Sequence, residues 1–133
     1  MENEKLSDAE IAIMRVLWAK GTPMKAGEIV KSLAETHSWK TQTAHVLLSR
    51  LCNKGYIDAD RSGYFHKFFP IISEEEYLVS ESVNLCGRVG RTVPAMVASL
   101  ISSEGISERE IDELTQLLEA KKSELQKRKD GGK

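Results

Sequence analysis

The sequence predicts a mainly helical protein with one short β-hairpin. Three Ser-x-x-Glu segments, which begin at Ser7, Ser73 and Ser107, have the pattern of a capping box at a helix start, and apolar residues at helical spacing follow each one. Residues 56–69 instead follow the period of two that is typical of strands. With 133 residues, of which 41% are hydrophobic, the chain has the size of one globular domain or of a small domain with an appendage.

The first predicted helix begins after Ser7 and ends at Gly21, a residue type that favours the left-handed stop of a helix. Its apolar face is formed by Ile11, Met14, Leu17 and Trp18. Thr22-Pro23 then predicts the start of a second, shorter helix. The inward residues of that helix are Ala26, Ile29, Val30 and Leu33.

The third predicted helix spans residues 41–54 and is followed by Gly55 as its C-terminal stop. Its apolar stripe follows the i, i+3, i+4, i+7 rule through Ala44, Leu47, Leu48 and Leu51. The opposite face is polar except for one valine, with Gln42, His45, Val46, Ser49, Arg50 and Asn53, and Thr43 on its flank. A short connection, residues 37–40, joins this helix to the second one.

A β-hairpin follows the three helices. Its strands are predicted over residues 56–60 and 64–69, with Arg61-Ser62-Gly63 as the loop and Pro70 as the end. The order helix, helix, helix, hairpin describes a winged helix-turn-helix, in which the third helix reads DNA and the hairpin is the wing. We therefore expect a DNA-binding domain over residues 1–72.

The second half, residues 73–133, predicts three more helices, over 73–89, 93–101 and 107–127. The last one keeps a heptad register through Ile111, Leu114, Leu118 and Leu125, with Lys121 as a polar interruption. Because a single helix of this length cannot bury such a stripe, it must pair with a second chain or fold back on its own domain. We expect a helical dimerisation domain, with Val79, Val83, Ile111, Leu114 and Leu118 at the interface.

The outward face of the third helix has the chemistry of a DNA reader. Gln42 is suited to adenine, Arg50 to guanine or a phosphate, and Val46 to the methyl group of thymine. Thr43, near the helix start, is suited to a phosphate. The alternative interpretation is an ordinary solvated helix face with one stray valine.

Charge gives a mixed signal. A net charge of −1 and a pI of about 6.3 over the whole chain argue against a nucleic-acid binder. Residues 37–70, however, hold five basic and two acidic side chains, a net charge of +3, whereas residues 71–133 hold nine basic and twelve acidic ones, a net charge of −3. This segregation suits a protein of which one part meets phosphate, although acidic solvated helices are also common.

Enzymatic, metal and membrane functions find no support in the sequence. His37, His45 and His66 lack the spacing of metal ligands, and no nucleophile elbow appears. The longest nearly apolar run, residues 93–101, is half of the roughly 18 residues that a membrane span needs. Cys52 and Cys86 form no Cys-x-x-Cys unit, which favours a reduced cytoplasmic protein, with a disulfide between them as the alternative. We expect no enzyme, no cofactor and no membrane partner.

Several segments resemble the BlaI/MecI/CopY family of penicillinase repressors. The opening Leu6-Ser7-Asp8-Ala9-Glu10 is similar to the start of that family. Three further segments resemble the family's signature for the helix that reads DNA. They are Trp39-Lys40-Thr41-Gln42-Thr43, Leu47-Leu48-Ser49-Arg50-Leu51 and Lys54-Gly55-Tyr56-Ile57. The likeness covers residues 6–120 and implies a bacterial repressor, a homodimer that binds double-stranded operator DNA with a palindromic sequence.

The resemblance also implies site residues. It places DNA contacts at Gln42, Thr43, His45, Val46 and Arg50, with the wing around Arg61 to Tyr64. At the start of the same helix we also expect contacts from Lys40 and Thr41. The family often has Ser-Pro where this chain has Lys40-Thr41, and it carries other residues in place of His45 and Val46, so the operator sequence does not transfer.

The inducing signal does not follow from the resemblance. Relatives that respond to β-lactams are cleaved at an Asn-Phe bond by the protease of a sensor system, and the matching pair here is Ser99-Leu100. Copper-responsive relatives carry a terminal cysteine cluster that this sequence lacks. We therefore expect a dimeric repressor released by an unidentified signal, with proteolysis at Ser99-Leu100 as a candidate. The alternative is a winged-helix module that binds proteins and not DNA.

Overall fold

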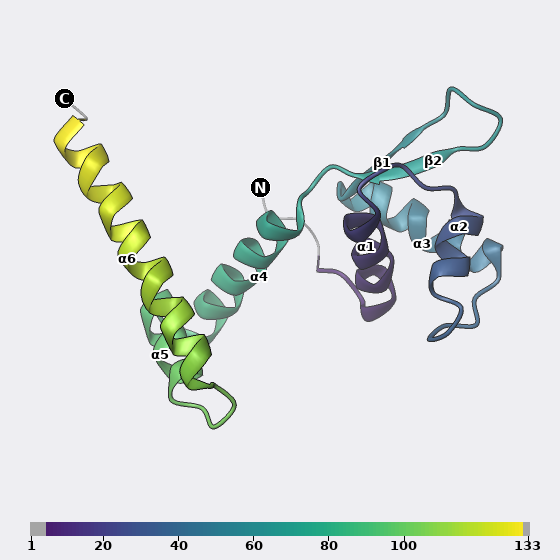
Figure 1. The fold of residues 1–133 in the computed structure, drawn as a ribbon. Helices are drawn as coiled ribbons and strands as arrows, with labels where there is room; N and C mark the ends of the chain where they lie inside the picture. The colour runs from purple at the N-terminus through teal and green to yellow at the C-terminus, as the bar shows by residue number, and fades with distance from the viewer. Residues whose placement is uncertain (1–4, 132–133) are drawn as a thin grey trace. The chain divides into compact units, whose positions relative to one another are not determined.

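A computed structural model describes residues 5–131 of the chain (Figure 1). Over this range the elements are α1 (Asp8–Lys20), α2 (Ala26–Ser32), α3 (Thr41–Lys54), β1 (Ile57–Asp60), β2 (Lys67–Pro70), α4 (Glu74–Val89), α5 (Val93–Ile101) and α6 (Glu108–Gly131). The residues fall into two compact units, one that ends at Glu81 and one that begins at Ser82. The predicted fold class, mainly helical with one hairpin, is confirmed.

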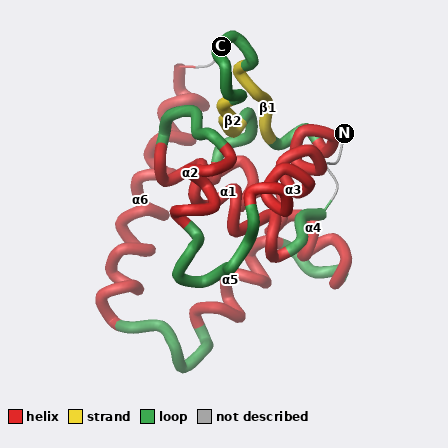
Figure 2. Tube along the Cα trace, turned by 90° about the vertical axis from the view of Figure 1, so that its right-hand side faces the viewer, coloured by secondary structure: helices red, strands yellow, loops and turns green. Residues whose placement is uncertain are grey.

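The N-terminal unit is a winged helix built from α1, α2, α3 and the β1–β2 hairpin (Figure 2). One hydrophobic core holds these elements together, with side chains from all three helices and from the hairpin. Its fully buried apolar side chains are Ile13, Met14, Leu17, Ile29, Leu48 and Leu51. This core fixes which side of α3 faces inward.

The first helix begins and ends as the sequence predicts. The hydroxyl of Ser7 accepts from the Glu10 backbone N–H at 3.2 Å, and the Glu10 carboxylate accepts from the Ser7 backbone N–H at 2.8 Å. Gly21 ends α1 at φ +74°, a conformation that disfavours other residues. The predicted apolar face was incomplete: Met14 and Leu17 are fully buried and the half-buried Ile11 and Trp18 pack against the core, but the prediction left out Ile13, which is also fully buried.

The predicted start of the second helix at Thr22-Pro23 was wrong. Lys25 is the N-cap residue and α2 begins at Ala26. The reason lies in Met24, whose backbone N–H donates to the Phe68 carbonyl at 2.9 Å and whose carbonyl accepts from the Phe68 N–H at 2.7 Å. Met24 thereby forms a bridge to the hairpin, and its side chain enters the core.

The third helix has the predicted bounds and the predicted inward face. Ala44, Leu47, Leu48 and Leu51 are all buried. Gly55 follows the helix at φ +86°, and the next residue, Tyr56, donates its backbone N–H to the Leu51 carbonyl at 3.0 Å. The chain therefore passes from α3 to β1 through a single tight turn.

The hairpin pairs Ile57 with Pro70 and Asp60 with Lys67 in an antiparallel register. The prediction that the second strand begins at Tyr64 was wrong, since residues 61–66 form the loop and β2 begins at Lys67. The first strand ends at Asp60 as predicted, where the Asp60 carboxylate accepts from both the backbone N–H and the hydroxyl of Ser62 at 3.0 and 2.6 Å and starts the turn. Because β2 begins three residues later than predicted, the wing loop, residues 61–66, is longer than predicted.

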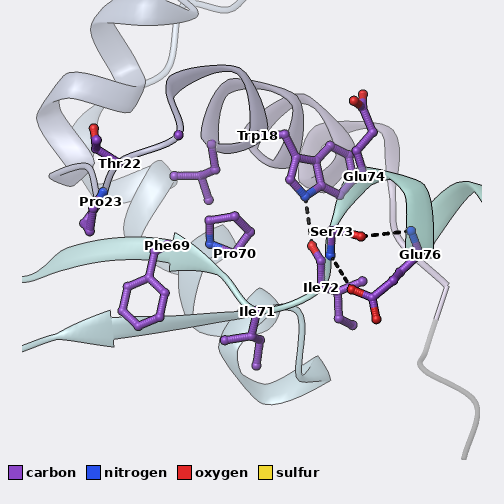
Figure 3. Close-up of a pocket in the computed structure, with 12 residues that line it drawn as sticks. Trp18, Thr22, Pro23, Phe69, Pro70, Ile71, Ile72, Ser73, Glu74 and Glu76 are labelled. Atoms are coloured by element: carbon purple, nitrogen blue, oxygen red, sulfur yellow. Dashed lines mark hydrogen bonds between the residues drawn. The ribbon is translucent and has the colours of Figure 1, made fainter.

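The start of α4 belongs to the N-terminal unit, whereas the sequence predicted a domain boundary after residue 72. The Trp18 indole donates to the Ile72 carbonyl at 2.9 Å, and Ser73 and Glu76 form a capping box (Figure 3). The ring of Tyr77 lies 5.7 Å from that of Trp18 and 6.0 Å from that of Tyr56. These aromatic contacts extend the compact unit to Glu81.

The C-terminal unit contains the rest of α4, all of α5 and all of α6. Thr92 caps α5 by accepting from the Ala95 backbone N–H at 3.2 Å, and Ser107 and Glu110 form the predicted capping box of α6. The last helix continues to Gly131, beyond the predicted end near Lys127. Between Ser82 and Gly131 the only buried side chain is that of Cys86, whose Sγ lies 3.5 Å from Sδ of Met96.

None of the helices over residues 5–131 combines the length and the apolar character that crossing a bilayer requires.

Candidate nucleic-acid interface

The outward face of α3 is a continuous exposed surface. All residues predicted to contact DNA are exposed, namely Lys40, Thr41, Gln42, Thr43, His45, Val46, Arg50, Arg61 and Tyr64. Val46 is the unusual member, since half of this apolar side chain is open to solvent. Because the core holds the opposite stripe of α3, the outward row is free to meet another molecule.

The N-terminus of α3 is open to an anion. Lys40 occupies the N-cap position, no side chain in the described range caps the helix, and its first turn contains no acidic residue. Backbone N–H groups in a first turn have no partner inside the helix, and the helix dipole adds partial positive charge there. Together with the Lys40 ammonium, this end of α3 favours a phosphate oxygen.

A groove of about 650 Å³ connects the start of α3 with the wing loop. Thr41 and His45 of α3 line it together with Tyr64 of the wing loop, so the structure brings these three predicted residues to one surface. Lys25 and Lys31 of the α2 region line the same groove, with Glu28 as its one acidic side chain. Lys25 and Lys31 thus add positive charge to this surface, although neither was predicted to contact DNA.

The wing loop is anchored by an aromatic contact that the sequence analysis missed. The ammonium of Lys25 lies 5.0 Å from the centre of the Phe65 ring, a distance at which a cation and a ring attract one another. The rings of Phe65 and Tyr64 meet edge to face at 4.8 Å, and the Tyr64 side chain is 93% exposed. The neighbouring aromatic pair was the available signal, but Phe65 was predicted to lie within a strand and not in the loop.

Arg61 is the first residue of the wing loop and directly follows β1. Its guanidinium is 3.9 Å from the carboxylate of Asp58 and donates to the Ala59 carbonyl at 3.4 Å. Both charged side chains are about three-fifths exposed, and pairs of this kind contribute little energy. Arg61 can therefore exchange Asp58 for a phosphate at small cost.

A buried ion pair holds the far end of α3. Nζ of Lys54 lies 2.7 Å from Oε1 of Glu10, and the Glu10 side chain is almost fully buried. Burial raises the pKa of Glu10, but hydrogen bonds from Lys54 and Ser7 outweigh this effect and leave the pKa below its usual value. The pair fixes the C-terminal end of α3 against the start of α1.

One further groove and the arrangement of possible metal ligands do not suit a nucleic acid or a metal ion. A second groove of about 500 Å³ lies between the end of α1 and the start of α4, where Glu74 and Glu76 supply its charged side chains (Figure 3). In the described range, no three His, Cys, Asp or Glu side chains gather in an arrangement that suits a metal ion.

The residues predicted for dimerisation are open to solvent in the single chain. Val79 is 63% exposed, Val83 52%, Ile111 42% and Leu118 63%, and Leu114 is half-buried. Ile111, Leu114 and Leu118 share one face of α6, whereas Val79 lies in the part of α4 that belongs to the N-terminal unit. Their role as an interface stays a prediction.

The candidate cleavage residues, Ser99 and Leu100, lie near the end of α5 and are exposed. The hydroxyl of Ser99 donates to the Ala95 carbonyl one turn earlier, at 3.1 Å. The bond between the two residues is thus accessible but helical.

A family model described as penicillinase repressor matches residues 6–120. The chain belongs to the penicillinase repressor family. The match covers α1 to α5 and the first half of α6, and it leaves residues 121–133 outside.

Two relatives are similar to this chain over most of their own length. The penicillinase repressor of Bacillus licheniformis is 32% identical over 120 residues, which cover 90% of this chain and 93% of the relative. The methicillin resistance regulatory protein MecI of Mammaliicoccus sciuri is 26% identical over 124 residues, 91% of this chain and all of the relative. The solution structure of the DNA-binding domain of the repressor BlaI is 32% identical and covers 57% of this chain and 92% of its own, with a TM-score of 0.49.

Proposed function

We propose that this member of the penicillinase repressor family is a dimeric repressor that blocks transcription by occupying operator DNA. The observation that carries the proposal is the outward face of α3, an exposed row of polar side chains with one cation and one exposed valine. A solvated helix face has no need of a half-exposed valine, whereas the methyl group of thymine in the major groove gives it a partner.

Different parts of the N-terminal unit contact the bases and the phosphates of the DNA. Gln42, Val46 and Arg50 read base edges in the major groove, because their spacing of four residues aligns these exposed side chains along one side of α3. Lys40 and the first turn of α3 hold one stretch of phosphates. Lys25, Lys31 and the wing loop, with Arg61 and Tyr64, hold a neighbouring stretch.

A second copy of the chain completes the DNA-binding surface. A single small module gives limited specificity, and two copies related by a two-fold axis read two half-sites of a palindromic operator. The exposed apolar side chains of the C-terminal unit, such as Val83, Ile111 and Leu118, support self-association as its role. Repression then depends on the dimer, since each arm alone binds weakly.

Release from the operator follows from loss of the dimer. Cleavage between Ser99 and Leu100 by the protease of a sensor system is the candidate signal, because it separates α6 from the rest of the chain. A protease needs an extended substrate, so α5 must first unwind locally at this point. A cleavage assay with the purified protease, followed by mass analysis of the fragments, tests this step.

A gel-shift experiment tests the proposal as a whole. The full chain is titrated against the DNA region upstream of its own gene and against a scrambled fragment of equal length and base composition. We expect half-saturation of the upstream fragment below about 1 µM protein, and weaker binding as salt is raised. If neither fragment shifts in the micromolar range, the chain is instead a winged-helix module that binds proteins.

A further inference from the structure

The groove between the end of α1 and the start of α4 lies wholly within the N-terminal unit. None of the residues that line it belongs to α3 or to the wing loop. Its volume of about 500 Å³ is in the range of pockets that bind small molecules. Figure 3 shows Trp18 on one side of it and Phe69, Pro70 and Ile71 on the other. The groove is therefore a candidate ligand site separate from the surface proposed for DNA.

The apolar walls of this groove are held in place. The Trp18 indole donates to the Ile72 carbonyl at 2.9 Å, and the centre of the Tyr77 ring lies 5.7 Å from that of the indole, so two contacts fix the orientation of the indole. Pro23 and Pro70 also line the groove, and their backbones are restricted by the proline ring. A flat apolar ligand would meet a preformed surface, which reduces the entropy cost of binding.

The groove offers few hydrogen-bond donors. The backbone N–H groups of Gly21, Ile71 and Ser73 already donate to acceptors within the unit. The two prolines have no N–H, and the indole N–H is taken by the Ile72 carbonyl. Among the described residues, no lysine or arginine lines the groove. An anionic ligand would therefore find neither a cation nor a set of free donors.

The α4 end of the groove carries two carboxylates, those of Glu74 and Glu76. Oε1 of Glu76 accepts from the Ser73 backbone N–H at 3.0 Å. Neither glutamate has an ion-pair partner within residues 5–131, and both are exposed. Carboxylates attract a positive charge, and so does the face of an indole ring at up to about 6 Å. The charge of the lining thus selects a cation.

We propose that this groove binds a small organic cation with a flat apolar body, of the class of aromatic amines and quaternary ammonium compounds. The apolar body lies against Trp18 and Pro70, and the cationic group lies at the α4 end near Glu74 and Glu76. A carboxylate ligand of similar shape is disfavoured, because its charge would face both acidic side chains without a counterion. The proposal goes beyond the proposed function and holds whether or not the chain binds DNA.

Tryptophan fluorescence of the full chain measures this binding. The chain has two tryptophans, so Trp39→Phe leaves Trp18 as the single reporter. Benzyltrimethylammonium is the cationic probe. Phenylacetate, with the same ring and a negative charge, and tetramethylammonium, with the charge and no ring, are the comparisons at constant ionic strength. We expect a dissociation constant of about 0.1–1 mM for benzyltrimethylammonium and binding about tenfold weaker or more for the other two. Isothermal titration of the wild-type chain checks the same constants without a substitution.

Glutamine variants test the position of the cation. E74Q/E76Q removes both charges and keeps the helix cap, because glutamine also serves at the third position of a capping box. We expect it to bind benzyltrimethylammonium about fivefold more weakly or worse. E75Q is the matched control, since Glu75 is an exposed neighbour that does not line the groove, and it should stay within about twofold of the wild type.

Three results would each overturn the proposed site. The first is equal affinity for benzyltrimethylammonium and phenylacetate. The second is unchanged affinity of E74Q/E76Q for the cationic probe. The third is a Trp18 emission that stays constant up to about 10 mM benzyltrimethylammonium, a concentration that would saturate the expected site.

Discussion

The Glu10 carboxylate and the Lys54 ammonium lie 2.7 Å apart and join the start of α1 to the end of α3. The same ammonium donates to the backbone carbonyl of Lys5 at 3.0 Å. The second carboxylate oxygen of Glu10 is buried and has no hydrogen-bond partner among the described residues. Lys54 is therefore the counterion on which a buried charge depends.

Removal of Lys54 should destabilise the N-terminal unit. Lys54→Met leaves the Glu10 charge buried without its cation, and we expect a loss of about 1–3 kcal/mol in the free energy of unfolding. Urea denaturation, followed by tryptophan fluorescence, measures the loss. Lys20→Met, which changes an exposed lysine at the end of α1, is the matched control and should stay within about 0.5 kcal/mol of the wild type.

The same pair makes stability depend on pH. The pKa of Glu10 is lowered in the folded state from its ordinary value of 4.5, so the unfolded chain takes up this proton first as the pH falls. The stabilising contribution of the carboxylate is complete above pH 4.5 and decreases as the pH falls through the folded-state pKa. The stability difference between the wild type and Glu10→Gln should therefore shrink between neutral and strongly acidic pH, and a constant difference would contradict it.

Arg50→Ala should weaken operator binding by about 1–3 kcal/mol without changing the melting temperature. The reason is that Arg50 is exposed on the outward face of α3 and takes no part in the core. Fluorescence anisotropy with labelled operator DNA measures the effect. Arg15→Ala, on the exposed side of α1, is the control. Equal affinities for both variants would remove Arg50 from the contact surface.

Lys40→Gln should weaken binding to operator and scrambled DNA by the same factor. Lys40 sits at the N-cap of α3, where a phosphate contact carries no sequence information. The slope of log affinity against log salt should become shallower by about one. Titrations at several salt concentrations give this slope. A selective loss on operator DNA would show instead that Lys40 contacts a base.

Leu118→Asp should convert the dimer to monomers. Leu118 is 63% exposed in the single chain, so an aspartate there does little harm to the chain itself but places a charge in the proposed dimer interface. Sedimentation velocity measures the oligomeric state. Gln116→Asp, an exposed change on the same helix, should leave the dimer intact. A persistent dimer in Leu118→Asp would move the interface away from α6.

The parts of the fold that the sequence predicts best are those with strong local signals. Each Ser-x-x-Glu box is a capping box in the structure, and Gly21 and Gly55 end their helices in the left-handed conformation. The bounds of α3 are exact, because its apolar stripe has one clear period between a polar start and a glycine stop. These signals act within a few residues and need no tertiary partner.

The errors occur where a distant partner decides the conformation. Thr22-Pro23 has the pattern of a helix start, but the two backbone hydrogen bonds between Met24 and Phe68 hold the chain in an extended conformation there. In α1 apolar residues occur on several sides, so spacing alone did not separate buried Ile13 from half-buried Ile11. Lys25 was missed at the candidate interface because its contact with Phe65 joins positions forty residues apart.

The two faces of α3 carry separate tasks. Its inward residues, Ala44, Leu47, Leu48 and Leu51, hold the fold, and its outward residues make no contribution to the core. Under the proposed function, substitutions at Gln42, Val46 or Arg50 change the preferred operator while the unit still folds. A few codon changes on the outward face can therefore redirect the repressor to new target genes in evolution, and every intermediate sequence still folds.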